Sequence, residues 1–264
     1  MKSRTISSIK NILAGVGGQL FNLILGFVNR SIFISILGIT YLGISGLFSS
    51  VLIMLSLAEL GVGTAIVYSL YKPLAEHDED KILALMNLYK KVYHIIGICI
   101  LAFGLVLTPF IKHFIKEDPG IANLKLIFFM FVFQSSVSYF FSYNRSLIVA
   151  DQKAYKLIWI DTSYSFINIF APLLILFITK NYLLYLALKI LTDIMRNLIV
   201  YFKVYKEYPV LKSDKKTKLD EETKHQLKKN IAALIVYKLA IVFSAGSDNI
   251  VISKFVGIAA TGLY

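Results

Sequence analysis

Charged side chains near the middle of long hydrophobic segments are the residues of this chain best placed for chemistry. A charge in hydrocarbon costs about 2.5–3.5 kcal/mol on insertion scales, so it persists where it faces water, an opposite charge or a ligand. The segments that carry these residues are long enough to cross a bilayer. A multi-spanning chain with many of them is predicted to be a transporter. The residues are Arg30, Glu59, Arg145, Lys189, Asp193, Arg196, Lys238 and Asp248.

The first hydrophobic segment carries a stripe of polar residues. Together with Gly26, the residues Gln19, Asn22, Asn29 and Arg30 recur at spacings of three and four, which places them on one face of a helix. Such a face either bonds to neighbouring helices or lines an aqueous cavity. Arg30 favours the cavity, because a guanidinium at this depth needs an anion or water. It can donate two parallel hydrogen bonds to a phosphate.

A similar face is predicted in the fourth hydrophobic segment. Gln134, Ser138 and Arg145 share it by the same spacing. Arg145 lies near the inner end of this segment, where its side chain could instead extend to the lipid headgroups. Both interpretations stay open for Arg145, whereas Gln134 and Ser138 are candidates for lining a cavity.

The sixth segment contains three charged residues on one predicted helical face. Lys189, Asp193 and Arg196 are spaced at i, i+4 and i+7. We expect an ion pair within the helix around Asp193, because pairing lowers the cost of placing charges in the membrane. The alternative is a charged wall that faces the cavity, with Asp193 as the carrier of a proton or another ion.

Two further carboxylates lie within predicted spans. Glu59 stands beside two glycines, which weaken a helix and permit a local bend. It could therefore mark a hinge or a cation site, or it could cap interrupted backbone. Asp248, in the seventh segment, could neutralise Arg30 or Lys238 across the bundle.

The composition predicts a polytopic, all-α membrane protein. The chain has 264 residues, of which 57% are hydrophobic and 17% charged, and its mean hydropathy is +0.69. Soluble domains have about 45–50% apolar and about 25% charged residues. The apolar excess is arranged in long runs, as expected for transmembrane helices.

Other kinds of site are not indicated. The single Cys99 excludes an internal disulfide framework. The histidines have no metal-ligand spacing, and no Walker loop, dinucleotide fingerprint or nucleophile elbow occurs. We therefore expect no cofactor, no metal and no enzymatic activity, with energy taken from an ion gradient or the membrane potential. The net charge of +12 lies mostly in loops, where it sets topology, so no nucleic-acid partner is expected.

Seven hydrophobic segments are predicted to cross the membrane as helices. With the N-terminus in the cytoplasm, the inner loops hold most of the basic residues, whereas the outer loops hold only Lys112, Lys116, Lys125 and Lys180. The positive-inside rule therefore predicts a multi-pass membrane protein with a cytoplasmic N-terminus. The segments are 11–37, 42–71, 92–112, 121–149, 157–179, 182–203 and 230–256.

An internal repeat relates the first and seventh segments. Residues 29–43 (NRSIFISILGITYLG) and 248–262 (DNIVISKFVGIAATG) align without gaps, and their glycines flank predicted outer hairpins. Such repeats are typical of transporters that bind substrate between paired bundles. We expect a six-helix N-terminal lobe over 1–203, a basic cytoplasmic linker over 204–229 and the start of a second lobe over 230–264.

The repeat also leads to an expectation about the length of the chain. Because the second copy stops after its first helix, we expect the chain to be an N-terminal fragment of a two-lobe protein. The linker is interpreted as solvated, with a surface for anionic lipid headgroups as the alternative. A short cytoplasmic helix is expected within 73–91, with acidic residues near its start.

Two stretches resemble a known family. Residues 57–65 (LAELGVGTA), continuing to 68–75 (YSLYKPLA), resemble the second-span signature of bacterial polysaccharide flippases of the Wzx type. Residues 247–255 (SDNIVISKF) and 262–264 (GLY) resemble their seventh span and the following hairpin. The hydropathy pattern agrees along the whole chain. The resemblance implies a member of the multidrug/oligosaccharidyl-lipid/polysaccharide exporter superfamily.

The resemblance implies two six-helix bundles around a central cavity, with alternating access. The implied substrate is an undecaprenyl-diphosphate-linked oligosaccharide, moved from the inner to the outer leaflet for surface polysaccharide biosynthesis. Membrane lipids, a polysaccharide polymerase and glycosyltransferases are the implied partners. Arginines would shield the diphosphate. The substrate-binding candidates are Gln19, Asn22, Asn29, Arg30, Gln134, Ser138, Arg145, Lys238 and Asp248, and the coupling-ion candidates are Glu59 and Asp193.

Two alternative functions stay open. A cation-coupled multidrug or peptidoglycan-precursor exporter of the same fold would depend on Glu59 and Asp193 more than on Arg30. A membrane-embedded glycan polymerase would need a sizeable outer loop for the reacting sugar, and the predicted outer loops are short.

Overall fold

The fold is that of a helical bundle, as the composition predicts. A computed structural model describes residues 23, 25–59, 61–213, 215 and 217–264, with only the backbone described at 58, 236, 238, 242 and 245. These residues form helices and connecting turns without any strand, so the predicted all-α, polytopic class is confirmed.

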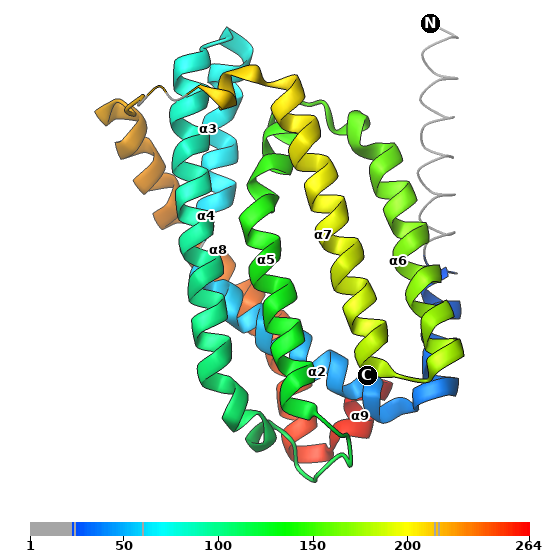
Figure 1. The fold of residues 1–264 in the computed structure, drawn as a ribbon. Coiled ribbons are helices and arrows are strands. Elements are labelled where there is room, and N and C mark those ends of the chain that lie inside the picture. Colours follow the sequence, from blue (N-terminus) through cyan, green and yellow to red (C-terminus); the bar gives the residue numbers. More distant parts are fainter. Residues whose placement is uncertain (1–22, 24, 60, 214, 216) are drawn as a thin grey trace, which may run out of the picture.

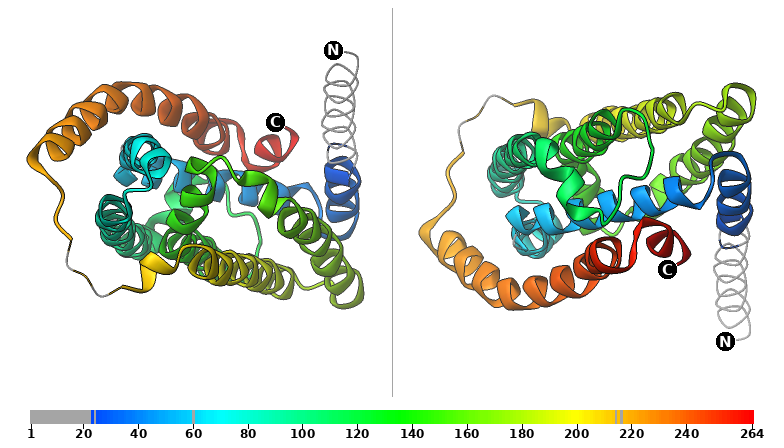
Figure 2. Two further views of the ribbon diagram at one scale, coloured as in Figure 1. Left: turned by 90° about the horizontal axis from the view of Figure 1, so that it is seen from above. Right: turned by 90° about the horizontal axis from the view of Figure 1, so that it is seen from below.

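Four long helices stand side by side in the order α4, α5, α7, α6 (Figure 1). On another face, α2 crosses the bundle obliquely and packs against α8 and α9 (Figure 2). The first described helix covers Leu25–Leu37. The α-helices that follow are α2 (Ile39–Leu55), α3 (Val62–Glu76), α4 (Glu79–Leu107), α5 (Leu124–Ala150), α6 (Ile158–Thr179), α7 (Tyr182–Glu207), α8 (Glu221–Val251) and α9 (Ile258–Leu263). Short 3-10 or π segments are η1 (Ser56–Glu59), η2 (Thr108–Phe114), η3 (Ala154–Leu157), η4 (Pro209–Lys212) and η5 (Ile252–Val256).

In the part of the chain that the structure describes, three helical segments are long and apolar enough to cross a membrane: Glu79–Phe114, Leu124–Ala150 and Ala154–Thr179. The number rises to five if each of two bent helix pairs counts as one span. These pairs are Leu25–Leu37 with Ile39–Leu55, bent by 120°, and Glu221–Ile241 with Gly246–Val256, bent by 42°. The count falls below the seven predicted spans partly because α7, although 26 residues long, carries several charges.

The predicted span 42–71 is not one helix. It is divided between α2 and α3 at η1, where Gly61 adopts a left-handed conformation with φ +79°. A side chain is disfavoured in this conformation, whereas glycine adopts it freely. The bend predicted beside Glu59 is therefore confirmed, and it places that carboxylate at a helix break inside the bundle.

The two ends of the bundle differ in their connections. We call the end with residues 77–78, 151–153 and 208–220 the linker end, and the end with residues 38, 115–123 and 180–181 the hairpin end. At the linker end, the short helix predicted within 73–91 is wrong, because α3 continues to Glu76 and α4 begins at Glu79 as one long helix.

Acidic residues start both helices at the linker end. Asp78 caps α4 by accepting a hydrogen bond from the backbone N–H of Lys81 at 3.0 Å. Asp220 caps α8, which begins at Glu221 and therefore shortens the predicted linker 204–229. Glu221 and Glu222 in its first turn suit the helix dipole, which explains why the helix extends this far. The linker is tied to α4 by ion pairs between Lys81 and Asp220 at 3.4 Å and between Lys215 and Asp80 at 2.9 Å.

The two copies of the predicted repeat have the same local shape. Gly38 and Gly257 occupy equivalent positions, have φ of +86° and +138°, and each begins a new helix. Both turns lie at the hairpin end, as the repeat predicts.

The copies also contact each other reciprocally. A Cβ atom on Gly43 would lie 2.0 Å from the carbonyl oxygen of Ile258, and one on Gly262 would lie 2.5 Å from that of Ile39. Gly43 and Gly262 are equivalent in the repeat, and so are Ile39 and Ile258. The α2 and α9 backbones can therefore approach this closely only because both positions are glycine.

Two apolar clusters hold the bundle together. One surrounds Tyr89 and Leu147 toward the linker end, and the other surrounds Phe48, Phe128 and Tyr185 toward the hairpin end. The middle portions of α5 and α7 between these clusters carry polar side chains, and the candidate site lies there.

Candidate functional site

A polar cleft of about 700 Å³ opens in the middle of the bundle. Side chains of α2, η1, α4, α5 and α7 form its walls, so segments far apart in the sequence meet there. Hydroxyl and amide groups predominate among the polar lining groups, with two carboxylates and one lysine. The polar lining residues are Ser49, Ser56, Glu59, Tyr93, Gln134, Ser135, Ser138, Tyr139, Ser142, Lys189 and Asp193.

Glu59 is held at one edge of the cleft by Tyr93. Its Oε1 accepts a hydrogen bond from the Tyr93 hydroxyl at 2.6 Å, and the Tyr89 hydroxyl donates to Ser146 at 3.1 Å. A Cβ on Gly63 would lie 1.9 Å from the Tyr93 hydroxyl oxygen. Gly63 therefore leaves the room in which Tyr93 reaches Glu59, which gives this glycine of the second-span signature a physical role.

Asp193 joins three helices at another edge of the cleft. Its carboxylate accepts hydrogen bonds from the Gln134 amide of α5 and from the Tyr164 hydroxyl of α6. The ion pair expected within α7 is wrong, because among the described residues neither Lys189 nor Arg196 pairs with Asp193. Neutral donors from the neighbouring helices satisfy the carboxylate instead.

The two cations of α7 lie against aromatic rings. The Lys189 ammonium lies 5.5 Å from the centroid of the Tyr185 ring, and the Arg196 guanidinium lies 4.1 Å from that of Tyr164. Cations are attracted to ring faces at such distances. Lys189 points into the cleft and has no carboxylate partner within the described structure. The sequence analysis favoured an ion pair with Asp193 and gave a position facing the cavity as the alternative; for Lys189 the alternative holds.

Arg30 and Asn29 line a smaller pocket of about 280 Å³ toward the hairpin end. This pocket shares Ser49, Phe131 and Lys189 with the cleft, so the two adjoin. Arg30 Nη2 donates to the carbonyl oxygen of Gly262 in the second repeat copy at 2.8 Å. The predicted pairing of Arg30 with Asp248 is wrong, because Asp248 accepts from the Tyr264 hydroxyl at 2.9 Å.

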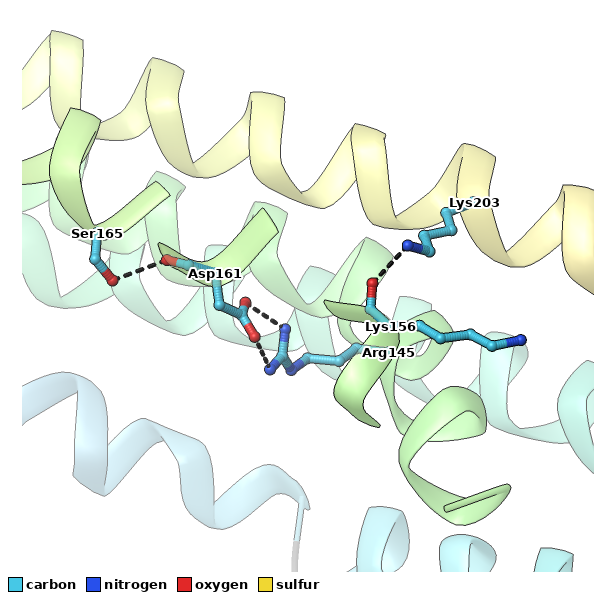
Figure 3. A network of polar contacts seen from close by, with 5 residues as sticks. All are labelled: Arg145, Lys156, Asp161, Ser165 and Lys203. Atoms are coloured by element: carbon cyan, nitrogen blue, oxygen red, sulfur yellow. Dashed lines mark hydrogen bonds and ion pairs between the residues drawn. The ribbon is translucent and has the colours of Figure 1, made fainter. Parts of the chain in front are cut away.

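Arg145 lies outside the cleft. Its guanidinium donates two parallel hydrogen bonds, of 2.8 and 2.7 Å, to the carboxylate of Asp161 in α6 (Figure 3). Beside this pair, the Lys203 ammonium donates to the backbone carbonyl of Lys156 (Figure 3). A paired guanidinium is a poor substrate-binding candidate. The sequence reasoning overlooked Asp161, although its place at the start of a hydrophobic segment was visible.

The remaining predicted site residues are distributed as follows. Gln134 and Ser138 lie in the cleft as expected, together with the coupling-ion candidates Glu59 and Asp193. Lys238 belongs to α8, and its side chain is outside the described part. Gln19 and Asn22 also lie outside the described residues. Within the described part, no group of three or more His, Cys, Asp or Glu residues could hold a metal ion.

A sequence profile described as "Polysaccharide biosynthesis protein" matches residues 8–264. No curated protein and no solved structure gave a significant match. The profile covers nearly all of the chain, including the helices that form the cleft, and it agrees with the membrane character of the bundle. The chain therefore belongs to the polysaccharide biosynthesis protein family.

Proposed function

We propose that the protein moves an undecaprenyl-diphosphate-linked oligosaccharide from the inner to the outer leaflet of a bacterial plasma membrane, as a Wzx-type flippase. The observation that carries this proposal is the polar cleft at mid-bundle, which adjoins a pocket with two cations. Family membership supports a role in making or exporting polysaccharide. Polar side chains are costly in a membrane interior, and they are expected where a hydrophilic group crosses the membrane.

The lining offers different groups to different parts of the proposed substrate. Ser135, Ser138 and Gln134 provide hydroxyl and amide groups that suit sugar hydroxyls. Lys189 and Arg30 are cations without a carboxylate partner among the described residues, and they suit a diphosphate. The glycan would occupy the cleft, the diphosphate would lie toward the cations, and alternating access would expose the cleft to each side in turn.

We propose that the linker end faces the cytoplasm. The connections at this end carry most of the lysines, including Lys212, Lys215 and Lys218. The hairpin-end connections carry few basic residues, among them Lys112 and Lys180. Glycosyltransferases that build the lipid-linked glycan would then act at the linker end, and a polymerase would act on the opposite side.

A cation-coupled exporter of another substrate is the second candidate function. It is favoured by one observation, namely that Glu59 and Asp193 both face the cleft, each held by a tyrosine hydroxyl. Carboxylates in a membrane interior are typical carriers of protons or other cations. Glu59→Gln distinguishes the candidates: an exporter that carries its ion on Glu59 loses activity, whereas a flippase that depends on Lys189 and Arg30 keeps most of its activity.

The test of the proposed function removes the two cations. We expect Arg30→Ala and Lys189→Ala, expressed from the complete gene in a deletion strain, to abolish surface glycan while membrane protein levels stay normal. Lys125→Ala is the matched control, because Lys125 is an exposed lysine at the start of α5 outside the cleft. Surface glycan at the control level in both cleft variants would overturn the proposal.

A further inference from the structure

A second cavity lies between α6 and α7, outside the polar cleft. It is a groove of about 330 Å³, which we call the α6–α7 groove. Most of its wall is apolar and exposed, including Trp159, Ile167, Met195 and Ile199. The two helices are joined at residues 180–181 and diverge toward the linker end, where the groove lies (Figures 1 and 2). An apolar channel open to the surroundings suits a lipid chain.

One cation stands in this apolar wall. The Arg196 guanidinium stacks on the ring of Tyr164, with 4.1 Å between guanidinium carbon and ring centroid. Within the described structure, Arg196 has no ion-pair partner and no hydrogen bond. Arg145 differs from Arg196, because its guanidinium already donates two hydrogen bonds to the Asp161 carboxylate. The charge of Arg196 is therefore available to an anion that enters the groove, and a phosphate matches the planar donor fork.

The depth of Arg196 helps to identify that anion. At 1.5 Å per residue, it lies about 10 Å below Lys203 along the helix axis. The headgroup of a resident phospholipid stays near the membrane surface, where Lys203 and Lys206 of α7 are closer to it. The guanidinium stacks on Tyr164, which precedes the middle of α6, instead of extending toward these lysines. A phosphate reaches Arg196 if its lipid leaves the surface and moves inward.

The wall between the groove and the cleft is narrow. Tyr164 lines the groove with its ring, and its hydroxyl donates to Asp193, which lines the cleft. Lys189 in the cleft lies two helical turns from Arg196, about 10 Å toward the hairpin end. A phosphate group at Arg196 would therefore be separated from Lys189 of the cleft by a single hydrogen-bonded pair of side chains.

We propose that the α6–α7 groove is the lateral docking site of the lipid carrier, with its long isoprenoid chain in the groove and its phosphate at Arg196. This inference rests on the proposed function, which supplies a lipid-linked anionic substrate. The Tyr164–Asp193 hydrogen bond closes the passage from this site to the cleft. When it opens, the phosphate moves from Arg196 toward Lys189 and Arg30, while the chain stays between α6 and α7.

The test measures lipid binding to the purified full-length protein by native mass spectrometry. The probe is a polyprenyl monophosphate without sugar, and phosphatidylglycerol is the competitor. We expect Arg196→Ala to weaken polyprenyl phosphate binding at least tenfold and Arg196→Lys to weaken it less. Ile199→Trp, which fills the groove and keeps the arginine, should also weaken binding. Leu174→Trp is the matched control, because Leu174 is an exposed α6 residue outside the groove, and we expect unchanged binding.

Two results would overturn the inference. One is binding of polyprenyl phosphate to Arg196→Ala and Ile199→Trp at the level of the control. The other is equally strong competition by phosphatidylglycerol, which would make the groove a general phospholipid site. Failure of the proposed function gives a different pattern: Arg30→Ala and Lys189→Ala would keep surface glycan. Loss of lipid binding in the groove variants would still support the groove in that case, because the binding measurement involves neither sugar nor transport.

Discussion

The polar cleft and the α6–α7 groove use neighbouring faces of the same helix in different ways. On the cleft side of α7, Asp193 is satisfied by neutral donors and Lys189 faces other polar groups. On the groove side, Arg196 stands among apolar side chains with an aromatic ring as its only described contact. The three charges share one stripe in the sequence, yet the helices packed around α7 divide them between two cavities.

This difference shows that the environment of a membrane charge depends on what its neighbouring helices offer. Among the described residues, donors on α5 and α6 stabilise the Asp193 carboxylate without a counter-charge, and no carboxylate reaches Arg196. The cleft is therefore suited to a hydroxyl-rich ligand and the groove to a chain with one anionic group. The following predictions test this division, from the largest expected effect to the smallest.

Removing the carboxylate between the two cavities should have the largest effect. Asp193→Ala leaves the donors of Gln134 and Tyr164 without their acceptor. Each hydrogen bond lost in a membrane bundle costs about 1–2 kcal/mol, so we expect about 2–4 kcal/mol less stability. We also expect loss of surface glycan. Thermal unfolding in detergent measures the first effect. Asp193→Asn keeps an acceptor of the same shape and should retain most of the stability, and equal losses in both variants would contradict this account.

Breaking the attachment of α6 to α5 should affect the groove more than the cleft. The Arg145–Asp161 pair holds the start of α6, whose main helical neighbour is otherwise α7. We expect Asp161→Arg to cost about 1–3 kcal/mol, as for hydrogen bonds between charged groups, and to weaken polyprenyl phosphate binding.

The matched control for this pair is the charge exchange. Arg145→Asp combined with Asp161→Arg restores an attractive pair and should recover most of the stability and lipid binding. If the double variant loses as much stability as the two single variants together, the pair does not hold α6.

Removing one hydroxyl tests the wall between the cavities with a smaller effect. Tyr164→Phe keeps the ring under Arg196 and removes only the donor to Asp193. We expect about 1–2 kcal/mol lower stability, because one of the two hydrogen bonds to Asp193 is lost, with polyprenyl phosphate binding unchanged and the rate of glycan export altered. Weaker lipid binding in this variant would mean that the hydroxyl belongs to the docking site itself.

Protonation of Asp220 at the linker end should weaken the cap of α8 and affect neither cavity. Hydrogen bonds from Thr223 lower the pKa of Asp220, the cap of α8, to about 2. Because the folded pKa lies below the usual value, this contribution to stability is complete above about pH 4. It is lost as the pH falls through about 2.

The measurement is amide exchange at Thr223 between pH 5 and pH 2, where protection should decrease on acidification. Asp220→Ala should remove this pH dependence and leave lipid binding unchanged. A change in lipid binding would show that the cap of α8 is coupled to the groove.

Much of the fold could be predicted because hydrophobic length and charge distribution are local properties. The helical class, the bend beside Glu59 and the turns at Gly38 and Gly257 follow from such signals. The predicted span 230–256 covers only the apolar part of α8, because the charged first turns of this helix are helical but not apolar. The glycines beside Glu59 predict a bend in 42–71, but they do not show that this run divides into two separate helices.

The candidate site was only partly predictable. Gln134, Ser138, Glu59 and Asp193 were assigned to a cavity, and they line the same cleft. Arg145 was grouped with them because helical periodicity gives the face of a residue but not the helix that it meets. Asp161 and Tyr164 changed the interpretation of two charges, and both come from a neighbouring helix that spacing rules within one helix do not consider.

The sequence by itself determined that this is a membrane-embedded helical protein with polar groups at mid-span, because hydrophobic length and the cost of buried charge are written into each segment. It also determined where glycines allow helices to turn. Only the tertiary structure decided which charges are paired and which are free. The partner of a charge lies on another helix, and the packing of α2, α5, α6 and α7 fixes which side chains come within hydrogen-bonding distance.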